Sequence, residues 1–555
     1  MGLRLLKRPK NPLSDARFEM DTKELKERSV RSGAITLTAQ AMTTLIHMAS
    51  VIVLARLLTP QDYGIVTMVT AVTGFIELFR ELGLSSATIR TRGITHDQVS
   101  NLFWINTGLG ATITLVIAAS GPVMAWFYHK PQLVAVAASL SLTSVLSSLG
   151  TQHGALLNRD MRFATLAVIR ISAMLAGFAA ALIVALSGGT YWALVANNIV
   201  LAVWNTAGVW MASGFHPGKY KKKVGLRPLI NFGANVAGSD ILTYFHRNTD
   251  NVLIGRAWGA DQLGLYNKAY SLLMLPITNL RYPLNRVAYP ALSRLQDEPA
   301  AFRAYFVKYC TLLSFITMPI VAFLFASSAH VIRLFLGPRW MGASDLFSIL
   351  AIVSFIQAPS GLKSTVQTAM GRGRRLFRLS FISAAAAVTS FLIGLPWGAR
   401  GVAIGYCIGT YVILHPTLVY AFRDTPIRPS DFYRSISKPA VAALAMGAVL
   451  VLAEGRLTSL ADAPLLVLML LAGVTIYLGI FVLLPGGRRA LADYWDYVTI
   501  LWRAVTGPFH KRGRLKGGRT PAVSPEEEQE LETAASAFQD EPVPPATEPE
   551  DGSGG

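Results

Sequence analysis

Several ionisable residues interrupt long apolar stretches of this sequence, and their chemistry is the clearest guide to function. Among them are Arg247, Asp250, Lys268 and Lys363. A basic residue at the centre of a membrane-spanning helix costs about 2.5 to 3.5 kcal/mol on insertion scales, so such residues usually face a wet cavity or a partner. Arginine and lysine in a cavity suit anionic groups. These residues therefore predict a cation-lined site for an amphiphile with an anionic head, such as a lipid-linked phosphate or diphosphate.

The candidates differ in how readily a purely structural role explains them. Lys363 follows Pro359 and has no acidic neighbour in its own span, so it is the strongest candidate ligand. Arg247 and Asp250 lie three residues apart on one helix face, and an intrahelical ion pair is the alternative role for them. Lys268 lies about two turns into the next span. Binding and ion pairing both remain open for Arg247.

The sequence repeats itself at an offset of 200 residues. The segment HMASVIVLARLLTPQDYGIV aligns without a gap with RNTDNVLIGRAWGADQLGLY, so that Arg56 falls on Arg256 and Gly64 on Gly264. We interpret this as two homologous halves. Internal duplication of a helical bundle is typical of secondary transporters, in which the substrate is handled where the halves meet.

The same offset places Glu81 on Arg281. If the halves face each other about a pseudo-two-fold axis along the membrane normal, these opposite charges lie at similar depth near the cytoplasmic side, and we expect them to close an inner gate. Arg80 lies between Glu77 and Glu81, and an ion pair within the helix is again the structural alternative.

Composition assigns the chain to the membrane. Of its 555 residues 52% are hydrophobic and 15% charged, with a mean hydropathy of +0.42, and the apolar residues come in runs of about 20, the length that crosses a bilayer. The net charge of +19 arises from basic residues between these runs, which indicates membrane orientation and lipid headgroup contact rather than nucleic-acid binding. Cys310 and Cys407 both lie in apolar segments, which excludes a disulfide framework or a metal motif.

The apolar runs predict an all-α polytopic membrane protein with about fourteen transmembrane helices, arranged as two pseudo-symmetric six-helix lobes plus two extra carboxy-terminal helices. A basic link, HPGKYKKKVGLRP, separates the two sets of six. We expect the spans at residues 34–58, 64–89, 100–128, 133–157, 163–186, 191–212, 229–258, 263–292, 304–325, 343–370, 376–395, 402–422, 439–453 and 460–484.

Charge on the links sets the expected topology. Lys and Arg concentrate on every second link, whereas alternate links such as TPQDY and WGADQ are short and nearly free of them. The positive-inside rule then places both termini in the cytoplasm.

The same pattern divides the chain into segments. The tail has no Lys or Arg and is expected to be disordered, and its final GSGG is typical of an engineered scar. The predicted parts are a basic amino-terminal segment at 1–32, an N-lobe at 33–215, a basic cytoplasmic linker at 216–228, a C-lobe at 229–422, two extra helices at 436–485, a basic amphipathic segment at 486–520 and the acidic tail at 521–555.

Two segments carry a specific resemblance. TDNVLIGRAWGADQLGLYNKAYSLLMLPITNL and PLNRVAYPALSRLQ resemble the polysaccharide-transporter branch of the multidrug/oligosaccharidyl-lipid/polysaccharide exporter superfamily, the Wzx-type flippases. In the first half LARLLTPQDYGIVTMV, ELGLSSATIR and NLFWIN agree with it. The likeness is greatest to exporters of the colanic-acid type and covers about residues 29–484.

The resemblance implies that two lobes alternate in access around a central cationic cavity. It implies transfer of an undecaprenyl-diphosphate-linked oligosaccharide repeat unit from the cytoplasmic to the periplasmic leaflet of a bacterial inner membrane, for lipopolysaccharide or exopolysaccharide synthesis. The expected partners are this lipid, the bilayer and a polysaccharide polymerase or export machinery, and the expected state is a monomer.

The resemblance also assigns roles to the buried charges. Na⁺ or H⁺ is the coupling ion that it suggests, with Asp250 or Glu77 as the coupling group, and no other cofactor is expected. Glu81 stays the gating candidate on the ground of the 200-residue offset alone. The diphosphate role falls to Arg247 and Lys363, with Arg80, Lys268 and Arg281 as weaker candidates.

Other function classes fit the sequence less well. A cation-coupled drug antiporter of the same superfamily would need acidic and aromatic groups for cationic drugs, whereas this cavity has an excess of bases. A membrane-embedded polymerase or ligase generally needs a sizeable loop for catalytic residues, and the expected outer links are short. No nucleophile elbow, phosphate-binding glycine loop or metal cluster occurs in the sequence. A non-transporting assembly partner remains an alternative.

Overall fold

The computed structural model describes residues 22–81, 84–91, 93–221, 227–455, 461–488 and 491. Some side chains within these ranges lie outside the description, and those of Glu81 and Arg247 are among them. The predicted segments at 1–32, 486–520 and 521–555 therefore lie wholly or mostly outside the described residues. All regular structure in the described ranges is helical.

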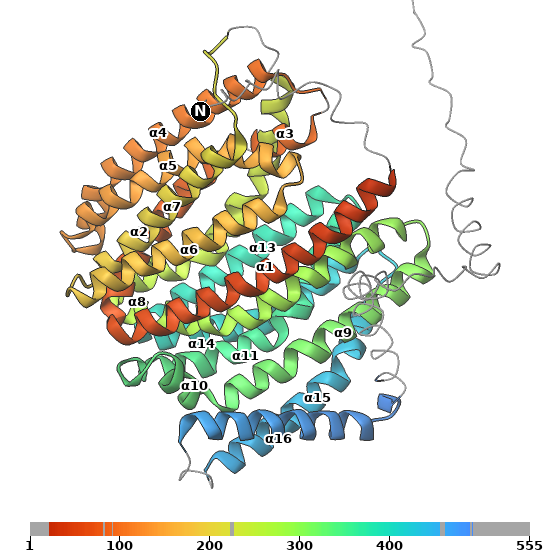
Figure 1. Cartoon of the computed structure of the whole chain (residues 1–555). Helices are drawn as coiled ribbons and strands as arrows, with labels where there is room; N and C mark the ends of the chain where they lie inside the picture. The colour runs from red at the N-terminus through yellow and green to blue at the C-terminus, as the bar shows by residue number, and fades with distance from the viewer. Residues whose placement is uncertain are drawn as a thin grey trace, which may run out of the picture. The chain divides into compact units, whose positions relative to one another are not determined.

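The first lobe is built from helices α1 to α7 (Figure 1). Helix α4 begins with a capping box. The backbone N–H of Gln98 donates to the Thr95 hydroxyl, and the backbone N–H of Thr95 donates to the side-chain oxygen of Gln98. Helix α4 packs on α5, α6 on α7, α5 on α7 and α1 on α6. The bounds are α1 Thr22–Leu57, α2 Pro60–Glu81, α3 Leu84–Arg90, α4 His96–Tyr128, α5 Leu133–Arg159, α6 Phe163–Leu186 and α7 Trp192–Ser213.

The second lobe repeats this packing. Helix α9 packs on α11, α13 on α14, α11 on α14 and α8 on α13, which is the same set of pairs at corresponding places in the chain. Helices α15 and α16 follow, and α15 lies against α9 (Figure 1). The bounds are α8 Arg227–Arg294, α9 Pro299–Ala326, α10 Ser328–Phe335, α11 Ala343–Ser360, α12 Leu362–Ala369, α13 Gly373–Gly394, α14 Gly398–Phe422, α15 Pro429–Glu454 and α16 Asp462–Leu483, with short 3₁₀ turns at Pro338–Trp340 and Leu395–Trp397.

Helix α8 consists of two helices joined at Gly259. Gly259 has φ 82° and ψ −177°, a conformation that residues with a Cβ avoid and that glycine adopts at little cost. The chain can therefore reverse within one residue. This break corresponds to the very short turn expected between residues 258 and 263.

The membrane assignment is confirmed by helix length and composition. In the described residues, ten stretches are long and apolar enough to cross a bilayer, and one of them, Gly373–Phe422, contains both α13 and α14. Helix α2 and the two halves of α8 carry more charge but are also long enough to cross. With these included and α13 and α14 counted separately, the described chain has the expected fourteen long helices.

Some boundaries differ from the expected ones. The run expected as one span at 64–89 is divided between α2, which ends at Glu81, and α3, which begins at Leu84. The run expected at 343–370 is divided at Gly361 into α11 and α12. Pro359 lies just before that division, and a proline has no N–H to continue the ladder of helical hydrogen bonds. The first extra helix begins at Pro429, upstream of the expected start at 439.

The two lobes meet most closely where α2 packs against α8. A Cβ added to Gly64 would collide with the Ala260 carbonyl, and a Cβ added to Gly264 would collide with the Pro60 carbonyl. These two contacts are related by the offset of 200 residues seen in the sequence. The reciprocity is that of a local two-fold axis between the halves.

A tryptophan reinforces this contact. The Trp340 indole N–H donates to the Ala55 carbonyl at 2.7 Å, and its ring packs edge-on against Tyr63 with 5.4 Å between ring centroids. Arg56 donates to the Leu334 carbonyl at 2.6 Å. We call this region, with the α1–α2 turn, Gly259 and Trp340, the closed end of the lobe interface.

Gly64→Ala should weaken the closed end. The added methyl group must push two helix backbones apart, and overpacking of this kind costs about 1 to 3 kcal/mol. We expect a lower melting temperature for the purified protein in detergent, with Gly264→Ala behaving alike. Gly479→Ala is the matched control, because a Cβ at this helical glycine meets open space. Equal melting temperatures for Gly64→Ala and Gly479→Ala would contradict the close contact.

Candidate functional site: a polar cavity in the second lobe

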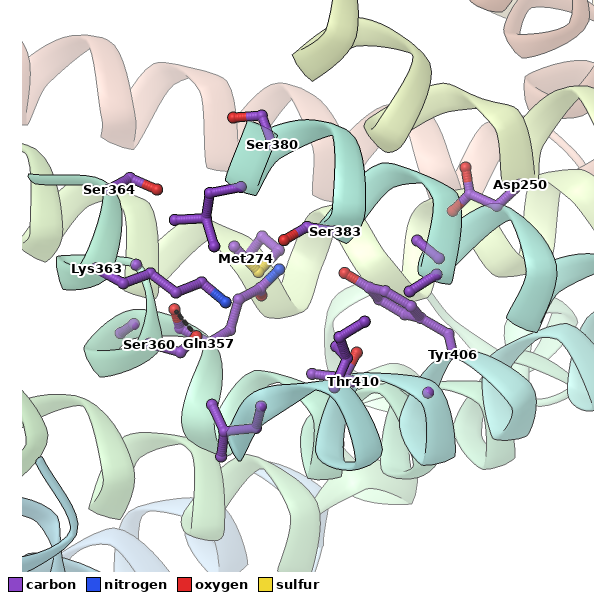
Figure 2. Close-up of a pocket in the computed structure, with 18 of the residues that line it drawn as sticks. Asp250, Met274, Gln357, Ser360, Lys363, Ser364, Ser380, Ser383, Tyr406 and Thr410 are labelled. Atoms are coloured by element: carbon purple, nitrogen blue, oxygen red, sulfur yellow. Dashed lines mark hydrogen bonds between the residues drawn. The ribbon is translucent and has the colours of Figure 1, made fainter. Parts of the chain in front are cut away.

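A cavity of about 710 Å³ lies inside the second lobe (Figure 2). Its lining residues come from α8, α11, α12, α13 and α14 and fall between Asn248 and Leu414. The volume lies in the range of about 300 to 1,000 Å³ that is typical of ligand pockets. The described lining is therefore a single-lobe site, although the sequence predicted a central cavity between lobes.

The lining is polar although the lobe is apolar. Its charged residues are Asp250, Arg281 and Lys363. Amides, hydroxyls and tyrosines supply most of the remaining polar surface. Such a set within membrane-spanning helices marks a route for a polar ligand, because unsatisfied polar groups are costly in hydrocarbon. The uncharged polar residues of the lining are Asn248, Asn251, Asn267, Tyr270, Thr278, Asn285, Gln357, Ser360, Ser364, Thr365, Ser380, Ser383, Tyr406 and Thr410.

Lys363 stands on α12, just after the break at Gly361. Its ammonium donates to the Thr417 hydroxyl on α14 at 2.9 Å. Among the described residues no carboxylate lies within ion-pair distance of it. A neutral hydroxyl holds the side chain in place without cancelling its charge. Lys363 is thus a half-buried cation available to an anion.

Arg281 reaches the same break from the second half of α8. A Cβ added to Gly361 would lie 3.6 Å from Arg281 Nη1, so the guanidinium lies beside a residue that has no side chain. The Arg281 Nε is buried and has no hydrogen-bond partner in the described part of the chain. Lys363 follows Gly361 by two residues, so both bases belong to the α11–α12 break. We call Arg281 and Lys363 the cavity cations.

Gln357 lies one helical turn before Gly361 on α11. Its amide Nε2 donates to the Tyr270 hydroxyl at 3.2 Å. Its carbonyl oxygen Oε1 is buried and finds no donor among the described side chains and backbone groups. Within the described part of the chain, the cavity wall at the break therefore presents a donor on Arg281 without an acceptor and an acceptor on Gln357 without a donor.

Asp250 lies at the other end of the cavity, with Tyr406 between it and Lys363 (Figure 2). Its carboxylate accepts hydrogen bonds from the Tyr266 hydroxyl at 2.9 Å and the Asn251 backbone N–H at 2.8 Å. It is 6% exposed. The cavity therefore separates its positive and negative charges along its length.

Helix α12 is fixed on α14 by polar contacts that also position the cavity cations. Besides the bond from Lys363 to Thr417, the Gln367 amide donates to the Ala421 carbonyl one turn further along. Beyond α12, Arg375 in the first turn of α13 donates from its guanidinium to the carboxylate of Asp424, which follows α14, at 2.8 Å. This hydrogen bond lowers the pKa of Asp424, so the contact persists at neutral pH.

The other sequence candidates are placed elsewhere. Arg80 forms an ion pair with Glu77 at 2.6 Å within α2, the structural alternative that the spacing left open, and Glu77 also accepts a bond from Ser144. The Lys268 ammonium lies 3.9 Å from the centroid of the Tyr63 ring, at the contact between lobes. Lys268 and this ion pair are absent from the lining of the cavity.

Two of the sequence candidates cannot be placed. The side chains of Arg247 and Glu81 lie outside the described residues, so Arg247 as a diphosphate ligand and the pairing of Glu81 with Arg281 as a gate stay predictions. Among the residues that sequence reasoning missed, Gln357 and Tyr406 matter most. Their only signal was a polar group in an apolar run, which many other residues of the chain share.

Comparison with known proteins agrees with this picture. Residues 53–345 match the family described as "Polysaccharide biosynthesis protein". The chain is 24% identical to the lipopolysaccharide biosynthesis protein WzxC of Escherichia coli K12, over 74% of this chain and 84% of that protein. It is 26% identical to the teichuronic acid biosynthesis protein TuaB of Bacillus subtilis 168, over 76% of this chain and 88% of that protein.

A solved structure shares the fold. The lipid II flippase MurJ in an inward closed conformation superposes with a TM-score of 0.65 and 13% identity, over 81% of this chain and 98% of that chain. The helical polytopic fold expected from the sequence is thereby confirmed. The family match and the relatives confirm the resemblance to the Wzx-type branch. The chain belongs to the polysaccharide biosynthesis protein family, as a multi-pass membrane transporter.

Proposed function

We propose that this protein is a flippase that moves an undecaprenyl-diphosphate-linked oligosaccharide repeat unit from the cytoplasmic to the periplasmic leaflet of a bacterial inner membrane. The observation that carries the proposal is the pair of cavity cations at the α11–α12 break, which lack a carboxylate partner among the described residues. The relatives named for lipopolysaccharide and teichuronic acid biosynthesis support the class of substrate.

A diphosphate fits the needs of this site. The Arg281 Nε–H has no acceptor among the described residues, and no described carboxylate pairs with Lys363, so an anion would satisfy both groups within a membrane lobe. A phosphate oxygen meets both requirements through charge-assisted hydrogen bonds. A cationic drug would be repelled by the same pair, so the cavity disfavours the drug-antiporter alternative.

Transport by alternating access requires the lobe interface to open at one end at a time. In this structure the lobes touch at the closed end, through Gly64, Gly264 and Trp340. Under the topology that the positive-inside rule predicts, the closed end faces the periplasm. The conformation would then be closed to the periplasm, and release would require these contacts to separate.

Lys363→Ala and Arg281→Ala should each slow flipping about 10- to 100-fold, the factor expected when a hydrogen bond between charged groups is lost. The measurement is the rate at which the lipid-linked repeat unit becomes accessible to a membrane-impermeant reagent on the periplasmic leaflet, at matched protein levels. Arg400→Ala is the control, since this exposed base on α14 does not line the cavity.

Depletion of the protein from cells tests whether it acts before or after translocation of the repeat unit. If the repeat unit reaches the periplasmic leaflet at the normal rate in depleted cells but is not polymerised or exported, the protein acts after translocation. The polymerase or assembly alternative would then replace the flippase proposal.

We further propose that Asp250, rather than Glu77, couples flipping to a Na⁺ or H⁺ gradient. Asp250 lines the cavity and accepts bonds from neutral groups among the described residues, whereas Glu77 is already neutralised by Arg80. A carboxylate that exchanges an ion must reach the transport route and must lack a permanent counter-charge.

In proteoliposomes, Asp250→Asn should abolish the acceleration of flipping by an imposed ion gradient and retain the gradient-free rate. Glu77→Gln should keep the acceleration. Separate Na⁺ and H⁺ gradients identify the ion. The assignment would be wrong if Glu77→Gln lost the response while Asp250→Asn kept it, or if wild-type flipping responded to neither gradient.

A further inference from the structure

We infer that the second-lobe cavity also holds the saccharide next to the diphosphate, with the first sugar between Gln357 and Tyr406. This inference rests on the proposed flippase function and adds residues that would determine specificity. It assigns the two parts of one head group to two parts of one cavity. The cavity cations bind the phosphates, and the uncharged stretch beyond them binds the sugar.

The charge distribution of the lining fits a ligand that has an anionic part and an uncharged polar part. The cavity cations lie at the α11–α12 break, and the stretch between Lys363 and Asp250 is lined by uncharged polar groups and Tyr406 (Figure 2). A diphosphate alone has no hydrogen-bond donor for the buried Gln357 carbonyl oxygen, which has no donor among the described residues, and neither has a hydrocarbon chain. A saccharide supplies hydroxyls that donate and accept, which suits amides and hydroxyls equally.

The junction between the two parts is marked by two buried atoms. Arg281 Nε is a donor without an acceptor, and Gln357 Oε1 is an acceptor without a donor, in the part of the chain that the structure describes. The Arg281 guanidinium lies beside Gly361, with Nη1 3.6 Å from the position of an added Cβ, and Gln357 lies one helical turn before Gly361, so both residues line the same part of the cavity. A phosphate oxygen satisfies the first atom and a sugar hydroxyl satisfies the second. A sugar phosphate carries these two groups side by side.

An aromatic wall follows the junction. Tyr406 on α14 and Phe391 on α13 both line the cavity, with 5.2 Å between their ring centroids and an angle of 51° between their planes. Phe391 is 1% exposed and backs the Tyr406 ring, so Tyr406 offers both the apolar contact to the C–H face of a pyranose and, through its hydroxyl, a polar edge. Alternation of apolar faces and polar edges is also the pattern of a sugar ring.

Cavity size restricts what else enters. A volume of about 710 Å³ is that of a site for a drug-sized ligand. It accommodates a head group of phosphates and sugar, and a polyprenyl chain remains in the bilayer. The cavity thus contacts the head group and does not contact the polyprenyl tail.

The test is equilibrium binding to the purified full chain in detergent with two probes. One is undecaprenyl diphosphate, and the other is the lipid-linked repeat unit that accumulates in cells depleted of the protein. Gln357→Leu and Tyr406→Ala should weaken binding of the glycosylated probe about 5- to 10-fold, as expected for one lost hydrogen bond or ring contact. Binding of undecaprenyl diphosphate should change less than about twofold. Lys363→Ala should weaken both probes.

Tyr411→Ala is the matched control for Tyr406→Ala. Tyr411 is a tyrosine of the same helix that donates to the Ile352 carbonyl and does not line the cavity, so its loss should affect neither probe. Tyr406→Phe keeps the ring and should retain most of the affinity for the glycosylated probe. The melting temperature of each variant is measured beside its affinity, so that a loss of binding is separated from a loss of stability.

The failures of the two proposals are distinguishable. If the wild-type chain binds and flips both lipids, but Gln357→Leu and Tyr406→Ala weaken both probes equally or neither, the saccharide subsite is overturned and the flippase stands. If the wild-type chain binds and flips neither lipid, both proposals are wrong.

Discussion

The cost of holding charge in hydrocarbon governs this structure. A buried ion in a membrane helix must find a counter-charge, a polarisable partner or a ligand. Arg80 has its counter-charge in Glu77, and Lys268 has the face of the Tyr63 ring. The cavity cations have neither solution among the described residues. Their charge is therefore stabilised by what enters the cavity, and this dependence makes them the centre of the site.

Helix breaks make such a site compatible with a membrane bundle. The two breaks that matter are at Gly259, where positive φ allows α8 to reverse, and at Gly361, next to Pro359, where α11 gives way to α12. Irregular backbone at membrane depth is tolerated where protein buries it or where it lines a polar cavity. Gly259 is the irregular residue of the two, whereas Gly361 keeps helical φ and ψ and its N–H still donates to the Gln357 carbonyl; the Arg281 guanidinium lies beside it.

The fold could be predicted from the sequence because it depends on patterns that extend along the whole chain. Runs of apolar residues fix the helices, and the duplication is visible in Gly64 and Gly264, which the structure places in reciprocal contact. The candidate site was only partly accessible. Lys363 stood out because its own helix offers no acid. Spacing within one helix revealed the pairing of Arg80 but could not show that Lys268 faces the other lobe, since that contact joins residues distant in the chain.

The cavity lies within the second lobe, so a ligand bound there needs a structural connection to affect the first lobe. A ligand shifts a conformational equilibrium only through different affinities for the two states, and a ligand that touches one lobe needs a link to the interface. Helix α8 offers one. Tyr266 bonds to Asp250 at the end of the cavity, and two residues further Lys268 lies on the Tyr63 ring of the first lobe. Asp250 is therefore connected to the contact between the lobes through one short segment of α8. The cation–π pair at the lobe interface and the hydrogen bond to Asp250 at the cavity are thus carried by the same turn of α8.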